Sequence, residues 1–342
     1  MKAVGYRASL PITDADSLLD LDVPAPTPGP RDLLVAVQAV AVNPVDTKVR
    51  MRAAPQPGEV AILGWDAVGV VQATGEAVTL FRPGDAVFYA GSIARQGTNA
   101  ELHVVDERIV GPKPASLSNA EAAALPLTAI TAWELLFDRL GVARSDVQAG
   151  NASDAGSLLI VGGAGGVGSI LIQLARKLTG LTVIATASRP ETTAWCVDLG
   201  AHHVIDHTRP LAEELSRVGV PQVDMIASLT ATDRHFPSYA DILKPQGKLA
   251  LIDDPAALDI VPLKRKSISV HWELMFTRSL FETRDMIAQH QLLAEVSSLV
   301  DTGVIRTTLG EYLGAINAAN LKRAHALIES GSARGKLVLE GF

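Results

Sequence analysis

The sequence has very little cysteine. Cys196 is the only cysteine among 342 residues. A single thiol cannot form an internal disulfide, and it cannot supply a four-cysteine structural zinc lobe or a Cys2His catalytic zinc site. The surrounding segment ETTAWCVDLGA predicts a helix with the thiol among apolar neighbours. We interpret Cys196 as a buried side chain that fills space and not as a nucleophile.

Excess positive charge and long apolar runs are also missing. The formal net charge is -7, which provides no broad basic surface for a phosphate backbone and makes nucleic acid a poor candidate partner. No segment reaches the ~18 uninterrupted apolar residues that a membrane helix needs, and the N-terminal residues MKAVGYRASLPITDAD contain no apolar core. We therefore expect a cytoplasmic protein with a small-molecule substrate and neither a membrane nor a nucleic-acid partner.

What is present is a hydrophobic content of 48%, enough to fill the cores of two domains. Up to about residue 120, short apolar runs such as DLLVAVQAVAVN alternate with turns, which predicts a β-rich, barrel-like region. From there to residue 276, strands alternate with helices, which predicts a parallel sheet covered by helices on both faces. The polar residues 141–157 predict an exposed connection, and the final GKLVLEGF resembles a strand of the first region.

A glycine-rich loop provides the clearest chemical signal. Gly163, Gly165 and Gly168 fit the pattern G-x-G-x-x-G between the apolar strand LLIV and an apolar helix, and Gly166 and Val167 complete the loop. Side chains at the first two glycines would block the tight turn and the approach of a pyrophosphate, whereas the third lets helix and strand pack closely. Unpaired amides at a helix start favour an anion. The loop therefore predicts dinucleotide binding, with a merely tight turn as the alternative.

The next predicted strand, LTVIATASRPE, indicates which nicotinamide cofactor binds. NAD sites usually end this strand with a carboxylate, but here it ends in Ser188 and Arg189. A hydroxyl and a guanidinium favour a 2'-phosphate, so we predict NADPH. Glu191 lies slightly late for the acidic role, although a shifted loop could bring it in. His207, after the following strand, either supports the same phosphate or is an ordinary exposed histidine.

These motifs together resemble a known family. Nearly the whole chain is similar to the medium-chain dehydrogenase/reductase superfamily. The segments that carry this resemblance include AVNPVDTKVR, LGWDAVGVV, RPGDAVFYAG, IVGGAGGVGSI, DLGAHHVIDH and GKLVLE. The likeness is greatest to its zinc-free branch of quinone oxidoreductases and enone reductases, and to sequences called zinc-type alcohol dehydrogenase-like proteins. It implies an α/β fold with a GroES-like β-barrel substrate domain (1–122 and 277–342), a doubly wound parallel-sheet Rossmann cofactor domain (123–276), a cleft between them, and a homodimer.

The resemblance also implies that the catalytic metal ligands are missing. Zinc-dependent relatives carry a cysteine where this sequence has Asn43, and Gly-His-Glu where it has GWD at 64–66. The remaining candidates, Asp66, His103 and His271, would have to converge from three distant segments to bind zinc. We therefore expect no metal site.

Without a metal ion to act as Lewis acid, conjugate reduction is favoured over alcohol oxidation. Hydride from the reduced nicotinamide adds to the β-carbon of an activated alkene or to a quinone, and hydrogen-bond donors stabilise the negative charge that develops. The candidate donors are Asn43, Lys48 and Tyr89. Lys48 is the first candidate because relatives often carry a tyrosine or a proton-relay histidine there. The alternative is a solvated lysine paired with Asp46 or Asp66.

Other residues are assigned only by the resemblance. Thr128 and Thr131 match positions near the nicotinamide and its ribose, or else cap a helix. His271, in SVHWELMFTRS, matches a segment that lines the nicotinamide pocket and pairs subunits. Arg334 or Lys336 reaches the cofactor phosphates, or is a plain charge on an edge strand.

The predicted function is thus an NADPH-dependent oxidoreductase that reduces a quinone or an α,β-unsaturated carbonyl compound without catalytic zinc. Two alternatives stay open: a zinc-dependent alcohol dehydrogenase, and a catalytically silent protein that senses or binds NADPH. The glycine-rich loop cannot separate the enzyme from the silent protein, because both would bind the cofactor.

Overall fold

The computed structural model describes residues 1–145 and 156–342 and divides them into two compact units. The first unit contains Met1–Ile130 and Phe276–Phe342, and the second contains Thr131–Met275. The predicted domains met at 122/123 and 276/277. In the structure the first division falls later, between residues 130 and 131, inside the continuous helix α3 (Pro126–Trp133). Most of the predicted exposed connection, residues 146–155, lies outside the described residues.

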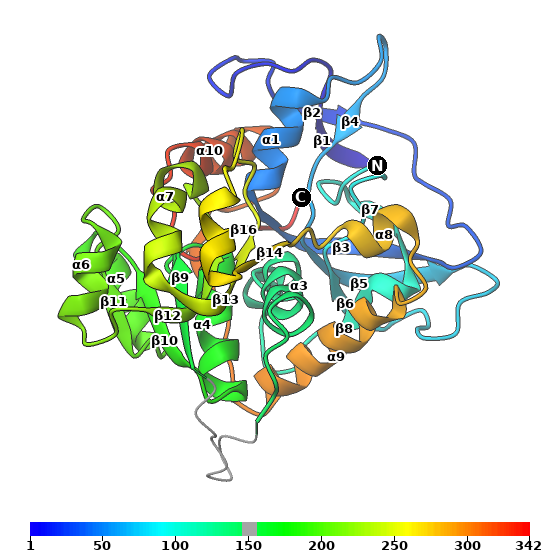
Figure 1. The fold of residues 1–342 in the computed structure, drawn as a ribbon. Coiled ribbons are helices and arrows are strands. Elements are labelled where there is room, and N and C mark those ends of the chain that lie inside the picture. Colours follow the sequence, from blue (N-terminus) through cyan, green and yellow to red (C-terminus); the bar gives the residue numbers. More distant parts are fainter. Residues whose placement is uncertain (146–155) are drawn as a thin grey trace. The chain divides into compact units, whose positions relative to one another are not determined.

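The second unit is built on a six-stranded parallel sheet with the order β11-β10-β9-β12-β13-β14 (Figure 1). The strands are β9 (Ser157–Val161), β10 (Thr182–Thr186), β11 (His203–Ile205), β12 (Val223–Ser228), β13 (Leu243–Leu251) and β14 (Ser269–Trp272). The chain enters the sheet at β9 in the middle, continues through β10 to β11 at one edge, crosses back to β12 beside β9, and continues through β13 to β14 at the other edge. This is the strand order of a dinucleotide-binding sheet, and it confirms the predicted Rossmann-type fold.

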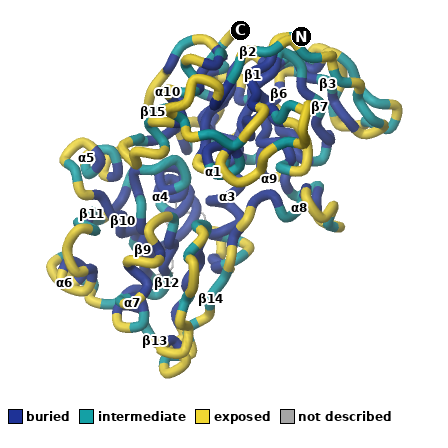
Figure 2. Tube along the Cα trace, turned by 90° about the horizontal axis from the view of Figure 1, so that it is seen from above, coloured by how far each residue is buried: buried dark blue, intermediate teal, exposed yellow. Residues whose placement is uncertain are grey.

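The helices of this unit bury apolar faces against the sheet. Helix α4 (Gly166–Leu178) packs on β9 and β10, α5 (Pro190–Asp198) on β11, and α7 (Thr232–Ile242) on both β13 and α6 (Leu211–Arg217). Strand β9 is buried along its whole length, because it has neighbouring strands on both edges and helices over its faces. Figure 2 shows the buried strands inside the unit and the exposed connections around them.

The first unit contains two sheets and corresponds to the predicted β-rich, barrel-like region. The smaller sheet joins β1 (Lys2–Tyr6), β2 (Leu19–Asp22) and β4 (Ala61–Ile62). The larger sheet has the order β15-β16-β3-β5-β6-β8, and β7 also pairs with β3. Its strands are β3 (Asp32–Val42), β5 (Ala67–Thr74), β6 (Ala86–Tyr89), β7 (Leu102–Asp106), β8 (Val110–Pro112), β15 (Leu309–Tyr312) and β16 (Lys336–Glu340).

Strand β3 organises this larger sheet. Strand β5 follows one edge of β3, while β7 pairs with residues 32–36 and β16 with residues 39–42 on the other edge. The end of β3 leads directly into helix α1 (Pro44–Arg52). Asn43 is the N-cap of α1 and forms a capping box with Asp46, and Pro44 occupies the first turn, where its missing N–H costs nothing. Residues 41–43 are therefore fixed between a buried strand and a capped helix.

Four further helices complete the first unit: α2 (Asn119–Ala123), α8 (Thr277–Phe281), α9 (Ile287–Asp301) and α10 (Ala318–Glu329).

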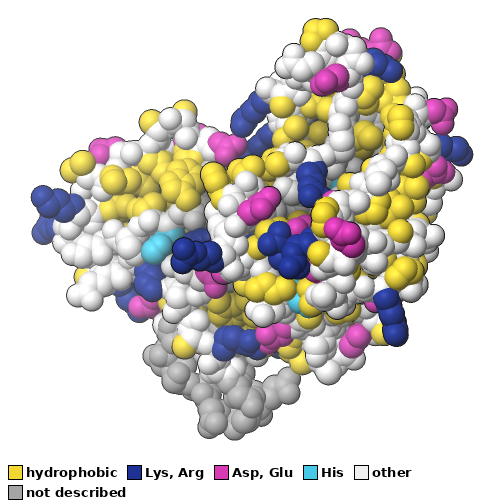
Figure 3. Space-filling model, turned by 90° about the vertical axis from the view of Figure 1, so that its right-hand side faces the viewer, with side chains coloured by type: hydrophobic (Ala, Val, Ile, Leu, Met, Phe, Trp, Pro, Cys, Tyr) yellow, Lys and Arg dark blue, Asp and Glu magenta, His cyan; other side chains and the backbone are white. Residues whose placement is uncertain are grey.

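On the face drawn in Figure 3, basic and acidic side chains are interspersed with apolar ones. This face therefore provides no broad patch of one charge.

Within the described part of the chain, one helical run is long and apolar enough to cross a membrane by composition. It spans Asn119–Arg139 and includes the π-helical turn η2 (Glu134–Arg139). The absence of a run of ~18 uninterrupted apolar residues had predicted no such segment, and polar residues do interrupt this one. Of the most apolar window of this run, 83% is buried inside the protein. Core helices pass the same test, so the run is weak evidence for a membrane span.

Candidate active site

The glycine-rich loop makes its turn one residue before the predicted motif. Gly162 has a φ of +90°, a left-handed conformation that favours glycine. A Cβ atom on Gly163 would lie 2.7 Å from the Ala185 Cβ and 3.1 Å from the Cys196 Sγ. Gly163 is therefore required by packing against β10 and α5, whereas the sequence analysis had assigned it to the turn and the pyrophosphate. Cys196 is fully buried, as predicted.

Gly165 and Gly168 have different roles in the loop. A Cβ atom on Gly168 would lie 2.4 Å from the Gly162 carbonyl oxygen, so this glycine allows the close packing that the sequence predicts. Among the described residues, a Cβ atom on Gly165 would have one neighbour within 4 Å, the Gly162 carbonyl oxygen at 3.5 Å. Gly165 is the N-cap of α4. Little of the surrounding protein occupies the space where its Cβ atom would lie. This space, beside the first amides of the helix at Gly166 and Val167, fits the diphosphate of a nicotinamide cofactor.

These two glycines provide a matched pair of substitutions. We expect Gly168→Ala to lower the free energy of unfolding by about 1–3 kcal/mol, because its methyl group would overlap backbone atoms that cannot rotate away. We expect Gly165→Ala to stay within about 1 kcal/mol of the parent but to weaken NADPH binding about tenfold or more. Urea unfolding and fluorescence titration measure the two effects. Unchanged NADPH affinity in Gly165→Ala would contradict the assignment.

The end of β10 presents the predicted cofactor-selecting residues. Ser188 is exposed, and Arg189 is half-buried as the N-cap of α5. Arg189 Nε lies 3.0 Å from a carboxylate oxygen of Glu191. Glu191 is therefore close enough to compete with a phosphate for this guanidinium, which sequence spacing alone did not indicate.

His207 lies beside this strand end. Thr186 of β10 pairs with Ile205 of β11, so the residues that follow the two strands are neighbours. His207 is half-buried, and its ring meets that of His235 edge-on with a centroid separation of 6.3 Å. Burial lowers the pKa of His207, Asp206 opposes this shift, and Arg234 adds to it. His207 is thus not a fully solvated loop histidine.

A buried polar network joins the two positions where zinc-dependent relatives would carry ligands. The Asn43 amide nitrogen donates to Asp66 Oδ2 at 2.8 Å, and the Lys336 ammonium donates to the same oxygen at 2.8 Å. Lys336 also donates to Asn43 Oδ1 and, at 3.2 Å, to the Val42 carbonyl oxygen. The other Asp66 oxygen accepts from the Leu127 N–H at 2.7 Å. All three side chains are buried, with at most 2% exposure.

This arrangement does not fit a tetrahedral zinc ion. The available donors are oxygens already bonded to an ammonium, and the site provides none of the sulfur or imidazole ligands that zinc prefers. Trp65, in place of a ligand histidine, is buried and donates to the Ser92 carbonyl oxygen at 3.3 Å. The residues described here contain no group of three His, Cys, Asp or Glu side chains arranged to hold a metal.

His103 does not serve as a zinc ligand either, because both of its ring nitrogens have partners. One nitrogen lies 3.1 Å from the Tyr89 hydroxyl and the other 3.0 Å from the Gln96 carbonyl oxygen. Burial lowers the pKa of His103 to about 4 and raises that of Tyr89. Tyr89 is fully buried, so its hydroxyl does not reach solvent.

Of the three predicted oxyanion donors, the structure leaves one accessible. The amide of Asn43 is engaged on both sides by Lys336 and Asp66, and Tyr89 is enclosed with His103. Lys48 lies on α1 and is half-exposed. The assignment of a donor stays a prediction, and the geometry favours Lys48.

Two members of this region, Lys336 and Asp46, have roles that the sequence did not predict. Lys336 is neither an edge-strand charge nor near solvent, because β16 lies between β15 and β3. Asp46 is 1% exposed and accepts from the Asn43 N–H at 2.7 Å. Burial raises the pKa of Asp46 to about 7, against the opposing effects of that N–H and of Lys336. The available signals were a lysine at the start of the apolar segment LVL and an Asn-x-x-Asp capping pattern.

The residues assigned by resemblance lie in helices and strands of ordinary geometry. Thr128 Oγ1 donates to the Leu125 carbonyl oxygen at 3.1 Å, a local helix contact. Thr131 is buried on α3. His271 lies on the edge strand β14, half-exposed, with Nε2 at 3.2 Å from Ser269 Oγ. The cofactor roles of Thr131 and His271 stay predictions.

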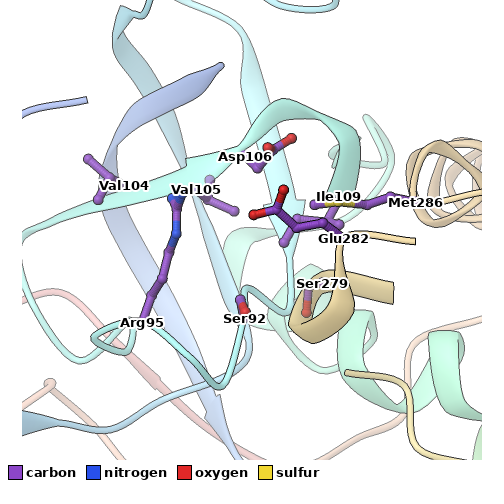
Figure 4. Close-up of a pocket in the computed structure, with 9 residues that line it drawn as sticks. All are labelled: Ser92, Arg95, Val104, Val105, Asp106, Ile109, Ser279, Glu282 and Met286. Carbon is purple, nitrogen blue, oxygen red and sulfur yellow. The ribbon is translucent and has the colours of Figure 1, made fainter. Parts of the chain in front are cut away.

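The first unit also contains a separate small pocket with about 340 Å³ of open space (Figure 4). The loop at Ser92, strand β7 and the segment 279–286 surround it. Two of its charged groups are already paired: Arg95 with Asp32 at 2.8 Å, and Asp106 with Arg108 at 2.7 Å. We therefore do not place the reaction in this pocket.

Comparison with known proteins agrees with this architecture. Residues 29–115 match the alcohol dehydrogenase GroES-like domain, and residues 199–339 match the zinc-binding dehydrogenase family. A zinc-type alcohol dehydrogenase-like protein of Staphylococcus aureus is 40% identical over 343 residues, which cover 99% of both chains. The chain belongs to the medium-chain dehydrogenase/reductase superfamily. Within this superfamily it lies in the zinc-type alcohol dehydrogenase-like and quinone oxidoreductase branch, whose members are oxidoreductases that use a nicotinamide cofactor.

Solved structures of this superfamily have the same fold. A Rhizobium etli protein, provisionally described as a zinc-dependent alcohol dehydrogenase, is 60% identical, with a TM-score of 0.94 and coverage of 100% of this chain and 98% of the other. A mycobacterial protein complexed with NADPH is 25% identical, with a TM-score of 0.82 and coverage of 99% of this chain and 100% of the other.

Proposed function

We propose that this oxidoreductase transfers hydride from NADPH to a quinone or to an α,β-unsaturated carbonyl compound, without catalytic zinc. The observation that carries the proposal is the Lys336 ammonium bonded to Asn43 and Asp66, where a zinc-dependent relative would need metal ligands. A small-molecule substrate and a cytoplasmic location are part of the same proposal.

The chain's own residues would divide the work as follows. The loop from Gly163 to Gly168 holds the diphosphate at the start of α4, and Ser188 and Arg189 bind the 2'-phosphate. The bound reduced nicotinamide supplies the hydride. Lys48 donates a hydrogen bond to the oxygen on which negative charge develops, and can supply the proton that completes the reduction. The Lys336 charge does not serve as this electrophile, because Asp66 compensates it.

Two other functions would be recognised by their outcomes. A zinc-dependent alcohol dehydrogenase would oxidise alcohols and depend on bound zinc. A silent NADPH-binding protein would bind the cofactor tightly, and no acceptor in the panel would lead to NADPH oxidation. The network at Asn43 disfavours the first, and the mycobacterial complex with NADPH is compatible with the second.

NADPH oxidation tests the reaction and the role of Lys48. Purified protein is incubated with NADPH and a panel of quinones and enones, and we expect turnover with at least one class. Lys48→Met should lower kcat about 10²- to 10⁴-fold, because the oxyanion loses its donor. The control Lys177→Met removes an exposed lysine from α4 and should leave kcat unchanged. Equal kcat for Lys48→Met and the parent would remove Lys48 from the mechanism.

Cofactor preference is tested at Arg189. Arg189→Ala should raise the Kd for NADPH about tenfold or more and leave the Kd for NADH within about twofold, because only NADPH carries the 2'-phosphate. Arg217→Ala is the matched control, since Arg217 also pairs with a nearby glutamate, at 2.8 Å from Glu214. A similar loss for both cofactors in Arg189→Ala would argue against a 2'-phosphate site.

We also propose that the protein is a homodimer paired through β14. This strand bonds to β13 on one side only, and its Trp272 is 57% exposed. Trp272→Asp should shift the sedimentation coefficient to that of a monomer. Tyr312→Asp, on the edge strand β15 of the other unit and 54% exposed, should leave it unchanged. A parent protein that sediments as a monomer would contradict the proposal.

A further inference from the structure

The Lys336 ammonium lies at a point surrounded by oxygen atoms. Its three hydrogens have three acceptors: the Asp66 carboxylate, the Asn43 side-chain carbonyl and the Val42 backbone carbonyl. The side chain is 2% exposed, so no water is needed to complete the set. This is the number of acceptors that a primary ammonium requires.

The three oxygens are held in place by groups other than Lys336. Asp66 is fixed by the Leu127 N–H at 2.7 Å and by the Asn43 amide at 2.8 Å. Asn43 is fixed by Asp46, which accepts from its backbone N–H. The Val42 carbonyl belongs to the last residue of β3, a strand paired on both edges. The oxygen cage therefore belongs to the fold, and Lys336 fills it.

We propose that this cage is a binding site for a monovalent cation that the chain fills with its own tethered ammonium. One carboxylate and two carbonyl oxygens form a hard donor set, suited to hard cations and poorly suited to zinc. A single positive charge balances the Asp66 carboxylate, and an ammonium or potassium ion is about the size of the group now there. The site would accept ammonium, a small primary alkylammonium or potassium once the side chain is shortened.

The site explains why a buried charged residue begins β16, a strand paired on both edges. An unpaired carboxylate at the Asp66 position would be strongly unfavourable in a buried environment, whereas the paired ammonium compensates it. The tether keeps the cation present at any salt concentration. Lys336 therefore acts as a positioning residue that holds Asn43 and the start of α1, which carries Lys48.

Thermal unfolding of full-length variants, without cofactor or substrate, tests this site independently of the proposed reaction. Lys336→Ala should lower Tm by roughly 10 °C, because it leaves a buried carboxylate uncompensated. Methylammonium or potassium chloride at about 100 mM should raise its Tm by roughly 4 °C relative to tetramethylammonium chloride at equal ionic strength. Tetramethylammonium has no N–H donor and is too large for the cage.

Matched variants separate the charge from the space. Lys336→Met fills much of the space of the side chain, so it should be destabilised without any rescue by small cations. Lys336→Ala/Asp66→Asn removes both charges and should recover Tm without cations. If Lys336→Ala alone fails to fold, its refolding yield with and without methylammonium provides the same comparison. Equal behaviour of Lys336→Ala in methylammonium and tetramethylammonium, or equal rescue of Lys336→Met, would overturn the proposal.

Discussion

The ion pair between Lys336 and Asp66 is the interaction on which the rest of the first unit's site depends. It joins residues that are 270 positions apart in the sequence. Through its neighbours it holds the end of β3, the start of α1, the segment before β5 and the start of α3. A buried ion pair is not by itself evidence of high stability, since desolvation offsets much of the attraction. Its contribution here is to position residues, because Asp66 and Lys336 hydrogen-bond to Asn43 and Asp66 also accepts from the Leu127 N–H.

The same pair gives a physical reason for the metal-free chemistry that we propose. A metal ion at this position would have to displace an ammonium from a buried cage and accept oxygen ligands of the wrong type for zinc. A reduction that needs only hydrogen-bond donors and a hydride source can proceed without such an ion. Lys48, half-exposed on α1, is the group that we propose for this polarising role. The family's association with zinc therefore does not extend to the donor set of this chain.

The fold could be predicted from the sequence where periodicity is strong. Alternating helices and strands between residues 120 and 276 predicted the parallel sheet, and VGSILIQLARKL predicted α4 after the glycine loop. The individual glycine roles were harder to predict, because only coordinates show that Gly163 meets Ala185 and Cys196 while Gly165 meets almost nothing. Sequence spacing identified the loop, and packing separated its structural glycines from the one that leaves space for a ligand.

The polar site could be predicted only in part. Asn43 and Asp66 were recognised as replaced ligand positions, but their partner Lys336 was not, since sequence spacing carries no information on so distant a contact. Tyr89 was named as a donor because its residue type is suitable, yet its strand is buried on both faces and its hydroxyl bonds to His103. Residue type predicts what a side chain can do. Burial decides whether a substrate can reach it.

The most direct test of the central claim is the dependence of turnover on zinc content. Protein purified without chelators is analysed for zinc, and its NADPH oxidation with an active quinone or enone is measured before and after dialysis against a chelator. We expect a zinc content far below one ion per chain and the same rate before and after dialysis. A stoichiometric zinc ion whose removal abolishes turnover, and whose return restores it, would contradict the account.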